Sequence, residues 1–155
     1  MAGEALGEIV LDDMRISDLA EVVEIERASC TLPWSESLFF NEIENTRSLP
    51  RVARKDGKVV GYLCASHLLD EGHILNLAVH PGLRRSGIAS SLIGDMIDRL
   101  KGEGCRFLFL EVRASNTEAK EIYEKFSFKV IGTRKNYYTS PAEDAVVMVL
   151  RMEEN

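Results

Sequence analysis

A short basic turn in the middle of the chain has the residue types of a phosphate-binding loop. Arg84–Ala89 (Arg-Arg-Ser-Gly-Ile-Ala) follows a predicted strand and opens a predicted helix, where free backbone N–H groups and the positive helix end attract anions. Gly87 and Ala89 are small enough for a pyrophosphate to approach the main chain. The turn is neither a Walker motif nor a dinucleotide fingerprint, so a basic surface turn without a ligand remains an alternative.

A carboxylate inside an apolar run is the second candidate. Glu111 stands in the run Phe-Leu-Phe-Leu-Glu-Val, and burying a carboxylate is costly unless it is paired or protonated. One interpretation places it at a strand end, paired with an arginine such as Arg113 or Arg134. The other makes it a general base that takes a proton from an amine, directly or through water.

Two aromatic residues have both a structural and a functional interpretation. Tyr123 lies on the apolar stripe of a predicted helix, yet a phenol is also a suitable proton donor for a departing thiolate. Trp34, the sole tryptophan, follows Pro33 in a predicted loop. It is either the wall of a pocket or an anchor of the core.

The elements that position these residues are expected in the order β-α-α-β-β-β-α-β-α-β-β. Ser17 and Ser35 are predicted N-caps of the first two helices, and Asp56-Gly57 predicts a two-residue hairpin. The apolar run at residues 107–112 predicts a strand covered on both faces. A β-α-β unit at the centre requires a parallel crossover. The fold class is therefore α/β (α+β-like), with a mixed central sheet of about seven strands and flanking helices.

The basic turn also carries a family resemblance. Arg84-x-x-Gly87-x-Ala89 resembles the Arg/Gln-x-x-Gly-x-Gly/Ala pyrophosphate loop of the GNAT superfamily of acyl-CoA-dependent N-acyltransferases, and the element order is similar to that fold over nearly the whole chain. Four stretches are similar to the bacterial ribosomal-protein-alanine N-acetyltransferases: LPWSE at 32–36, NLAVHP at 76–81, LEVRASN at 110–116 and RKNYY at 134–138. The sequence departs from that group at Ala89, usually glycine, and at Phe126-Ser127-Phe128, usually Leu-Gly-Phe.

The resemblance implies a role for each matching residue. Glu111 corresponds to the general base and Tyr123 to the acid. Tyr137 and Tyr138, expected in the loop between the last two strands, resemble a pair that clamps the acceptor peptide, with Trp34 beside them. The alternative is that at least one of the two tyrosines is half-exposed packing, because consecutive residues of a strand alternate faces. Acetyl-CoA binding is implied for Leu77, Ala78, Val79, Arg84, Arg85, Ser86, Gly87, Ile88, Ala89, Ser90 and Asn116, in a groove where two parallel strands separate. Asn116 is also interpreted as an ordinary residue at the start of a helix, and the two roles are compatible.

Composition narrows the class of protein. The 155 residues are 45% hydrophobic and 28% charged, which predicts one folded domain over 1–155 and excludes extensive disorder. No apolar run is long enough to span a membrane, and the first ten residues have no secretory pattern. The net charge of −6 disfavours a general nucleic-acid binder. It suits a cationic acceptor, although acidity also serves solubility alone.

Cysteine and histidine spacing indicates no metal site. Cys30, Cys64 and Cys105 are widely spaced, which argues against a disulfide framework or zinc. Cys64 and Cys105 are predicted core residues in a reducing compartment. The three histidines form no ligand pattern.

Together these features predict an enzyme that transfers an acetyl group from acetyl-CoA to a protein N-terminal α-amine. The resemblance implies the N-terminal alanine of a small-subunit ribosomal protein as acceptor, and a cytoplasmic location. The sequence does not indicate an oligomeric state. One alternative is a GNAT enzyme that acetylates a lysine side chain or a small amine. The other is a catalytically silent acyl-CoA-binding module.

Overall fold

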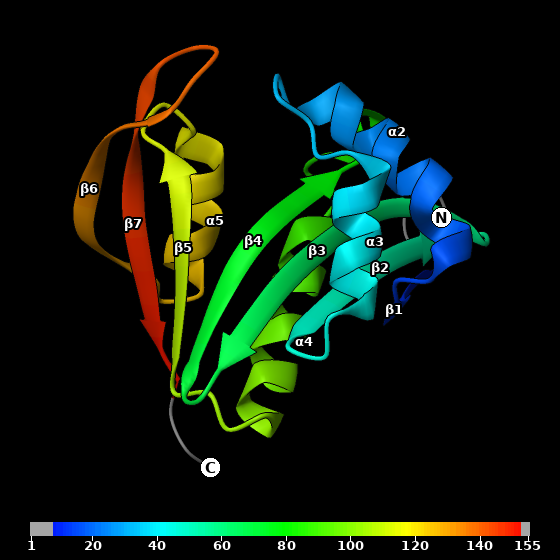
Figure 1. The fold of residues 1–155 in the computed structure, drawn as a ribbon, viewed down its shortest axis with the longest axis horizontal. Coiled ribbons are helices and arrows are strands. Elements are labelled where there is room, and N and C mark those ends of the chain that lie inside the picture. The colour runs from blue at the N-terminus through cyan, green and yellow to red at the C-terminus, as the bar shows by residue number, and fades with distance from the viewer. Residues whose placement is uncertain (1–7, 153–155) are drawn as a thin grey trace. The chain divides into compact units, whose positions relative to one another are not determined.

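The predicted order of strands and helices is confirmed over residues 8–152, which are the residues that the computed structural model describes (Figure 1). Residues 1–7, part of the stretch without a secretory pattern, lie outside them. With η marking a short 3-10 helix, the bounds are β1 Ile9–Asp13, η1 Ile16–Asp18, α2 Leu19–Ser29, α3 Glu36–Glu44, β2 Ser48–Lys55, β3 Lys58–Leu68, β4 Glu71–Val79, η2 Pro81–Leu83, α4 Ile88–Gly102, β5 Phe107–Arg113, α5 Thr117–Lys125, β6 Lys129–Tyr138 and β7 Glu143–Arg151.

The strands form one mixed sheet, in the order β1-β2-β3-β4-β5-β7-β6. β4 and β5 pair in parallel, with Glu71–His73 opposite Phe107–Phe109, whereas β1–β2, β2–β3, β5–β7 and β6–β7 pair antiparallel. A parallel pair needs a long crossover connection, and α4 supplies it. The predicted parallel crossover is therefore confirmed.

The described chain divides into two compact units. The first comprises residues 8–66 and 75–96, and the second residues 67–74 and 97–152. Strands β3 and β4 and helix α4 each contribute residues to both units. The single domain over 1–155 stays a prediction.

The first unit buries one face of helix α2. Leu19, Val22, Val23 and Ile25 are buried against β2 and β3 residues such as Tyr62. Figure 1 shows α2 and α3 on one face of these strands and the beginning of α4 on the other. At Gly61 on β3, a Cβ atom would lie 3.1 Å from Ile88 Cγ2 and 3.2 Å from the Ala78 carbonyl. The glycine thus allows the start of α4 to pack closely on the sheet.

One predicted helix cap is confirmed and the other is wrong. The Ser35 hydroxyl accepts the Leu38 N–H at 3.3 Å. Ser17, however, lies inside the short helix η1, and α2 begins two residues later with Asp18 at its cap position. The Asp18 carboxylate accepts the Arg15 N–H at 2.8 Å and pairs with Arg54 at 2.6 Å. These two bonds involve Asp18 rather than Ser17 at the start of the helix.

Strand β5 in the second unit alternates in burial rather than being covered on both faces. Leu108, Leu110 and Val112 are buried, while Phe107, Phe109 and Glu111 are half-buried. The prediction that the strand is covered on both faces is therefore wrong, because successive side chains point to opposite faces and one face is less buried than the other. As a consequence, Glu111 lies on the less buried face of the strand.

The turn after α5 tolerates the departure at residues 126–128. Ser127 has a φ of +73°, in the left-handed region that glycine adopts most easily. The Phe128 N–H still donates to the Tyr123 carbonyl at 3.1 Å. The serine therefore keeps the turn, and Phe128 packs edge-on against Tyr123, with 5.4 Å between ring centroids.

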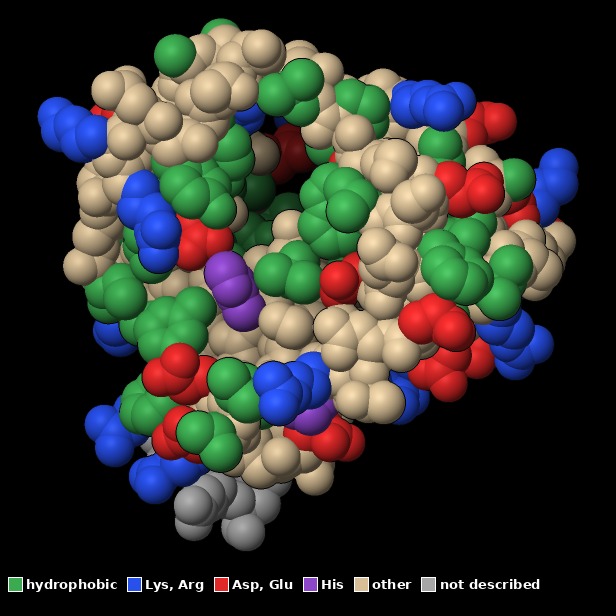
Figure 2. Space-filling view, viewed as in Figure 1, with side chains coloured by type: hydrophobic (Ala, Val, Ile, Leu, Met, Phe, Trp, Pro, Cys, Tyr) green, Lys and Arg blue, Asp and Glu red, His purple; other side chains and the backbone are tan. Residues whose placement is uncertain are grey.

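The surface charges, the cysteines and the helices can each be compared with what the composition predicts. Acidic and basic side chains are interspersed over the visible face (Figure 2). Cys64 and Cys105 are buried free thiols, as predicted. Within residues 8–152, no helix has both the length and the apolar character needed to cross a membrane. Over the same residues, no three His, Cys, Asp or Glu side chains are grouped to hold a metal ion.

Candidate active site

The basic turn in the first unit is a built loop rather than an extended linker. His80 Nδ1 accepts the Gly82 N–H at 3.0 Å, and the Ser86 hydroxyl donates to the Leu83 carbonyl. Arg85 and Gly87 have φ values of +66° and +87°. Helix α4 begins directly after this bend, so its first-turn N–H groups have no intrahelical acceptor and are available to an anion.

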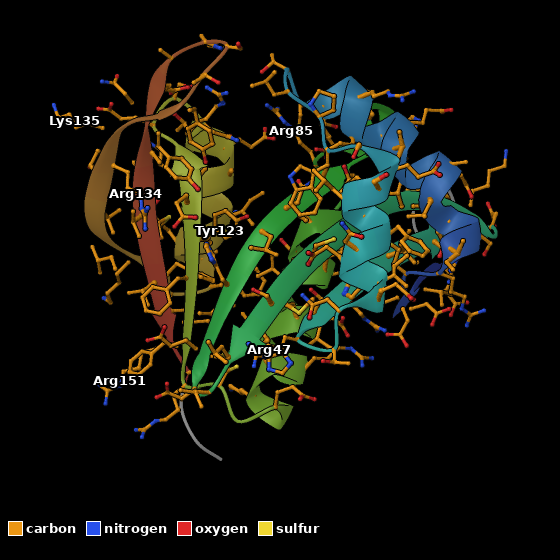
Figure 3. The ribbon with its side chains drawn as sticks, viewed as in Figure 1. Arg47, Arg85, Tyr123, Arg134, Lys135 and Arg151 are labelled. Atoms are coloured by element: carbon orange, nitrogen blue, oxygen red, sulfur yellow. The ribbon has the colours of Figure 1, made fainter. Side chains whose placement is uncertain are left out.

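Arg84 fixes the turn through its guanidinium. Arg84 donates from Nη2 to the Ser29 hydroxyl at 3.1 Å and from Nε to the Val79 carbonyl at 3.4 Å. It therefore ties the turn to the ends of α2 and β4. Arg85 lies in the same turn (Figure 3). A Cβ atom on Gly87 would meet no other atom within 4 Å, so there is open space beside the main chain at this residue.

The backbone of this turn gives a first prediction. Gly87→Ala places a side chain at a φ of +87°, a conformation that costs L residues about 1–2 kcal/mol. Relief of this strain would shift the N–H groups of the turn, so at the acetyl-CoA site expected from the sequence the dissociation constant should rise about tenfold, as measured by titration calorimetry. Gly102→Ala, at the end of α4 with open space around it, is the matched control and should bind normally. Equal binding by both variants would contradict a backbone-mediated anion site.

A buried carboxylate that the sequence did not single out binds three elements of the first unit. Glu26 on α2 is 1% exposed and accepts three hydrogen bonds: Tyr62 hydroxyl at 2.5 Å, Asn76 Nδ2 at 3.0 Å and the Trp34 N–H at 2.9 Å. Burial is the larger cause, and the hydrogen bond with Glu26 the next, of a raised pKa for the Tyr62 hydroxyl. This phenol is therefore protonated and donates the hydrogen bond. Glu26 thereby links α2 to strands β3 and β4.

Trp34 is fixed from two sides. Its backbone N–H donates to Glu26 Oε2, and its ring packs on Phe39 with 5.1 Å between centroids. Phe39 in turn meets Tyr62 edge-on at 5.4 Å. These contacts support the core-anchor interpretation of Trp34, while its half-buried side chain leaves the pocket-wall role as a prediction.

The predicted cofactor residues of strand β4 follow Asn76 directly. Leu77 is half-buried, and the next two residues, Ala78 and Val79, are buried.

In the second unit, Glu111 is paired with a histidine that the sequence analysis set aside. His73 Nε2 on β4 lies 2.7 Å from Glu111 Oε1 on β5. An ionised carboxylate can only accept, so the ring nitrogen carries the proton in that state. The Glu111 side chain is 11% exposed and that of His73 is 41% exposed. A nearly buried carboxylate thus has a hydrogen-bonded partner that reaches solvent.

The predicted arginine partners of Glu111 are engaged elsewhere. Arg113 pairs with Glu143 at 3.2 Å and lies over the ring of Tyr138 at 4.4 Å. Arg134, on β6 (Figure 3), lies over the ring of Tyr137 at 5.5 Å. The ion-pair interpretation of Glu111 with either arginine is therefore wrong. Alternate positions of β5 carry Glu111 and Arg113, and each is matched to a different neighbour.

Tyr123 lies on α5, as predicted, and Asn116 directly precedes that helix at its N-cap position. The Tyr123 side chain is buried (Figure 3), and burial raises its pKa, so the phenol is protonated at neutral pH. The Asn116 side chain accepts the Ala119 N–H at 3.1 Å and caps the helix. This cap accounts for the asparagine structurally, and its role toward a cofactor stays a prediction.

Tyr137 and Tyr138 end strand β6 rather than lying in the following loop. The register of β6 against β7 shifts between Arg134 and Tyr138, and a second shift lies between Val130 and Gly132. Asn136 has a φ of +53°, and its N–H donates to Asp144 Oδ1 at 2.9 Å. Because of this bulge the two rings do not point to opposite faces. They meet edge-on, with centroids 5.0 Å apart.

Comparison with known proteins places this architecture and its residues in a family. A sequence model of the acetyltransferase (GNAT) family matches residues 19–128. A ribosomal protein bS18-alanine N-acetyltransferase of Escherichia coli (strain K12) is 34% identical over 142 residues, covering 90% of this chain and 95% of that protein. The crystal structure of the ribosomal-protein-S18-alanine N-acetyltransferase from Escherichia coli gives a TM-score of 0.88 at 33% identity, covering 96% of each chain.

A more distant structure, Arabidopsis thaliana NAA60 in complex with acetyl-CoA, gives a TM-score of 0.85 at 22% identity, covering 94% of this chain and 99% of that one. It shares the fold. The chain described here belongs to the acetyltransferase (GNAT) family. Its activity is that of an acyltransferase that acetylates an amine nitrogen.

Proposed function

We propose that the enzyme transfers the acetyl group of acetyl-CoA to the N-terminal α-amine of a protein, and that its acceptor is the N-terminal alanine of a small-subunit ribosomal protein. The observation that carries the chemistry is the contact between Glu111 and His73 at 2.7 Å. The acceptor is supported by the identity of 34% to a ribosomal protein bS18-alanine N-acetyltransferase. Such an acceptor implies a reaction in the cytoplasm.

Acetyl-CoA is the acyl donor in this proposal. The open space at Gly87 and the first-turn N–H groups of α4 fit its pyrophosphate. The backbone of Leu77–Val79 would bind the pantetheine arm, and the Val79 N–H would stabilise the negative charge that develops on the thioester oxygen. The other residues assigned to the cofactor are Arg84, Arg85, Ser86, Ile88, Ala89, Ser90 and Asn116. The groove predicted between parallel strands stays part of the proposal.

Proton transfer is assigned to residues of the second unit. Glu111 takes the proton that the amine loses on attacking the thioester carbon, and the His73 ring, which donates to the ionised carboxylate from Nε2, orients that base. Since an α-amine has a pKa of about 7.7–8.0, a useful fraction is already neutral and the demand on the base is modest. Tyr123 donates its phenolic proton to the thiolate of coenzyme A. Glu111 then releases a proton to solvent and the Tyr123 phenolate takes one up, which restores both groups for the next turnover.

The acceptor side is assigned to aromatic residues. Tyr137 and Tyr138 would hold the peptide backbone, and Trp34 would form a further wall. A lysine acceptor, with a pKa of about 10.4, would need a stronger base. The aromatic pair favours a peptide over a small free amine, because a small amine needs no clamp.

The test measures thiol release from acetyl-CoA with two matched peptides. One has a free N-terminal Ala-Arg, and the other has a blocked N-terminus and an internal lysine. We expect rapid release with the free terminus alone. Release only with the lysine peptide would overturn the N-terminal assignment. Acetyl-CoA binding without release from either peptide would favour a small-amine enzyme or a silent binding module.

Tyr123 provides a second prediction that separates an enzyme from a binding module. Tyr123→Phe removes the proton donor while keeping the ring that packs on Phe128. Turnover should fall by about 10²-fold, within the usual range for a positioned acid, with the acetyl-CoA dissociation constant unchanged. Steady-state kinetics and calorimetry measure the two quantities. Full turnover in this variant would remove Tyr123 from the mechanism.

A further inference from the structure

The side chain of Arg113 makes an unusual number of contacts with one end of the second unit. Its Nη1 donates to Glu143 Oε1 at 3.2 Å and to the Pro141 carbonyl at 3.1 Å, and its Nη2 donates to the Thr139 carbonyl at 3.2 Å. The same guanidinium lies 4.4 Å from the centroid of the Tyr138 ring. One side chain from β5 therefore holds the segment that joins β6 to β7.

The anchor of Arg113 is itself fixed. The second oxygen of Glu143 accepts the Ser115 N–H at 2.6 Å. The pKa of the Glu143 carboxyl is lowered, first by its hydrogen bonds with Ser115 and then by Arg113. Glu143 is therefore ionised at neutral pH and joins the start of α5 to the guanidinium.

The aromatic rings continue the arrangement. Tyr138 meets Tyr137 edge-on, and Tyr137 lies under the guanidinium of Arg134, so the two rings stand between two cations. Burial, then the neighbouring Tyr137 and Glu111, raises the pKa of Tyr138 to about 12. Tyr138 is thus protonated, and it lies within electrostatic reach of Glu111.

We propose that Arg113 is a positioning residue that sets Tyr138, and with it the β6–β7 segment, in the orientation that receives the acceptor peptide. This proposal rests on the proposed function. A planar guanidinium can bond two carbonyls and a carboxylate while stacking on a ring, and an ammonium cannot. Arg113 lies two residues after Glu111 on β5. It therefore sets the aromatic pair with respect to the base on the same strand.

The experiment uses Arg113→Lys in the full chain, with the free Ala-Arg peptide as acceptor. We expect the peptide KM to rise about tenfold, since tenfold corresponds to about 1.4 kcal/mol of binding. The kcat at saturating peptide and the acetyl-CoA dissociation constant should stay within about twofold, since neither depends on capture of the peptide. Arg151→Lys, an exposed arginine at the end of β7, is the matched control and should leave all three unchanged.

A double-mutant cycle separates positioning from general stabilisation. With Tyr138→Leu already raising the KM, Arg113→Lys should add less than about twofold, because its effect acts through that ring. An equal rise in both backgrounds, or a fall in kcat with an unchanged KM, overturns the proposal. Should Arg113→Lys fail to fold, Glu143→Gln loosens the same anchor and must raise the peptide KM, or the proposal is wrong. Wild-type enzyme that does not acetylate the peptide instead overturns the proposed function.

Discussion

Glu111→Gln is expected to lower kcat by about 10²- to 10⁴-fold, the usual contribution of a positioned general base. The amide keeps the size of the side chain, and its oxygen still accepts the bond from His73 Nε2, which lies 2.7 Å from the carboxylate. It cannot take up a proton, so the amine must lose its proton to solvent before attack. The fold and the acetyl-CoA dissociation constant should be unchanged.

The pH profile gives this variant a distinctive signature. As the pH rises, a larger fraction of the α-amine becomes neutral, so the residual rate of Glu111→Gln should reach half of its maximum near the amine pKa of about 8 and level off about one pH unit above it. Stopped assays of peptide acetylation measure this rate. Glu121→Gln makes the same chemical change at an exposed position on α5 and should behave as wild type. A Glu111→Gln enzyme that keeps half of the wild-type rate would exclude Glu111 as the base.

Of the proposed substitutions, Glu26→Ala is expected to cause the largest decrease in the free energy of unfolding. It leaves the Tyr62 hydroxyl, the Asn76 amide and the Trp34 N–H without their acceptor. The Tyr62 hydroxyl is buried, whereas the donors of Asn76 and Trp34 are partly buried. A stranded buried donor costs about 1–3 kcal/mol, and a partly buried one costs less because water can replace its acceptor. We therefore expect a loss of about 3–6 kcal/mol in the free energy of unfolding, which is a large part of the total for a protein of this size.

Chemical denaturation, followed by the fluorescence of the single tryptophan, measures this loss. Glu24→Ala, an exposed glutamate two residues away on the same helix, is the control and should change the free energy by less than about 0.5 kcal/mol. Glu26→Gln should fall between the two, because one amide oxygen still accepts while the amide nitrogen meets donors. A Glu26→Ala protein as stable as the control would show that the three donors find other acceptors.

Local sequence signals predicted local structure well. The hairpin at Asp56-Gly57 forms with φ values of +53° and +78°, which those residue types adopt readily. The Ser35 cap, the helix after the basic turn and the Asn116 helix start depend on neighbours within a few residues. The prediction of Ser17 as a helix cap was wrong because the ion pair between Asp18 and Arg54, which competes with that cap, joins positions far apart in the chain.

The side-chain networks could not be predicted in this way. His73 meets Glu111 because the parallel register sets Glu71–His73 beside Phe107–Phe109. Spacing along the chain carries no trace of that register. Glu26 is likewise bound by residues from a loop and two strands. The edge-on tyrosine pair depends on the bulge at Asn136, whereas simple alternation predicts rings on opposite faces.

The irregular backbone of β6 also affects the tendency of separate molecules to associate through their sheet edges at high concentration. This strand is the last in the sheet, and Val130 and Ile131 on it are each 57% exposed. A regular, apolar sheet edge readily recruits strands from other molecules. Here the two register shifts interrupt the row of free backbone groups, and Lys129, Arg134 and Lys135 add like charges along it. Concentrated solutions of the protein should therefore resist the edge-to-edge association that leads to fibrous aggregates.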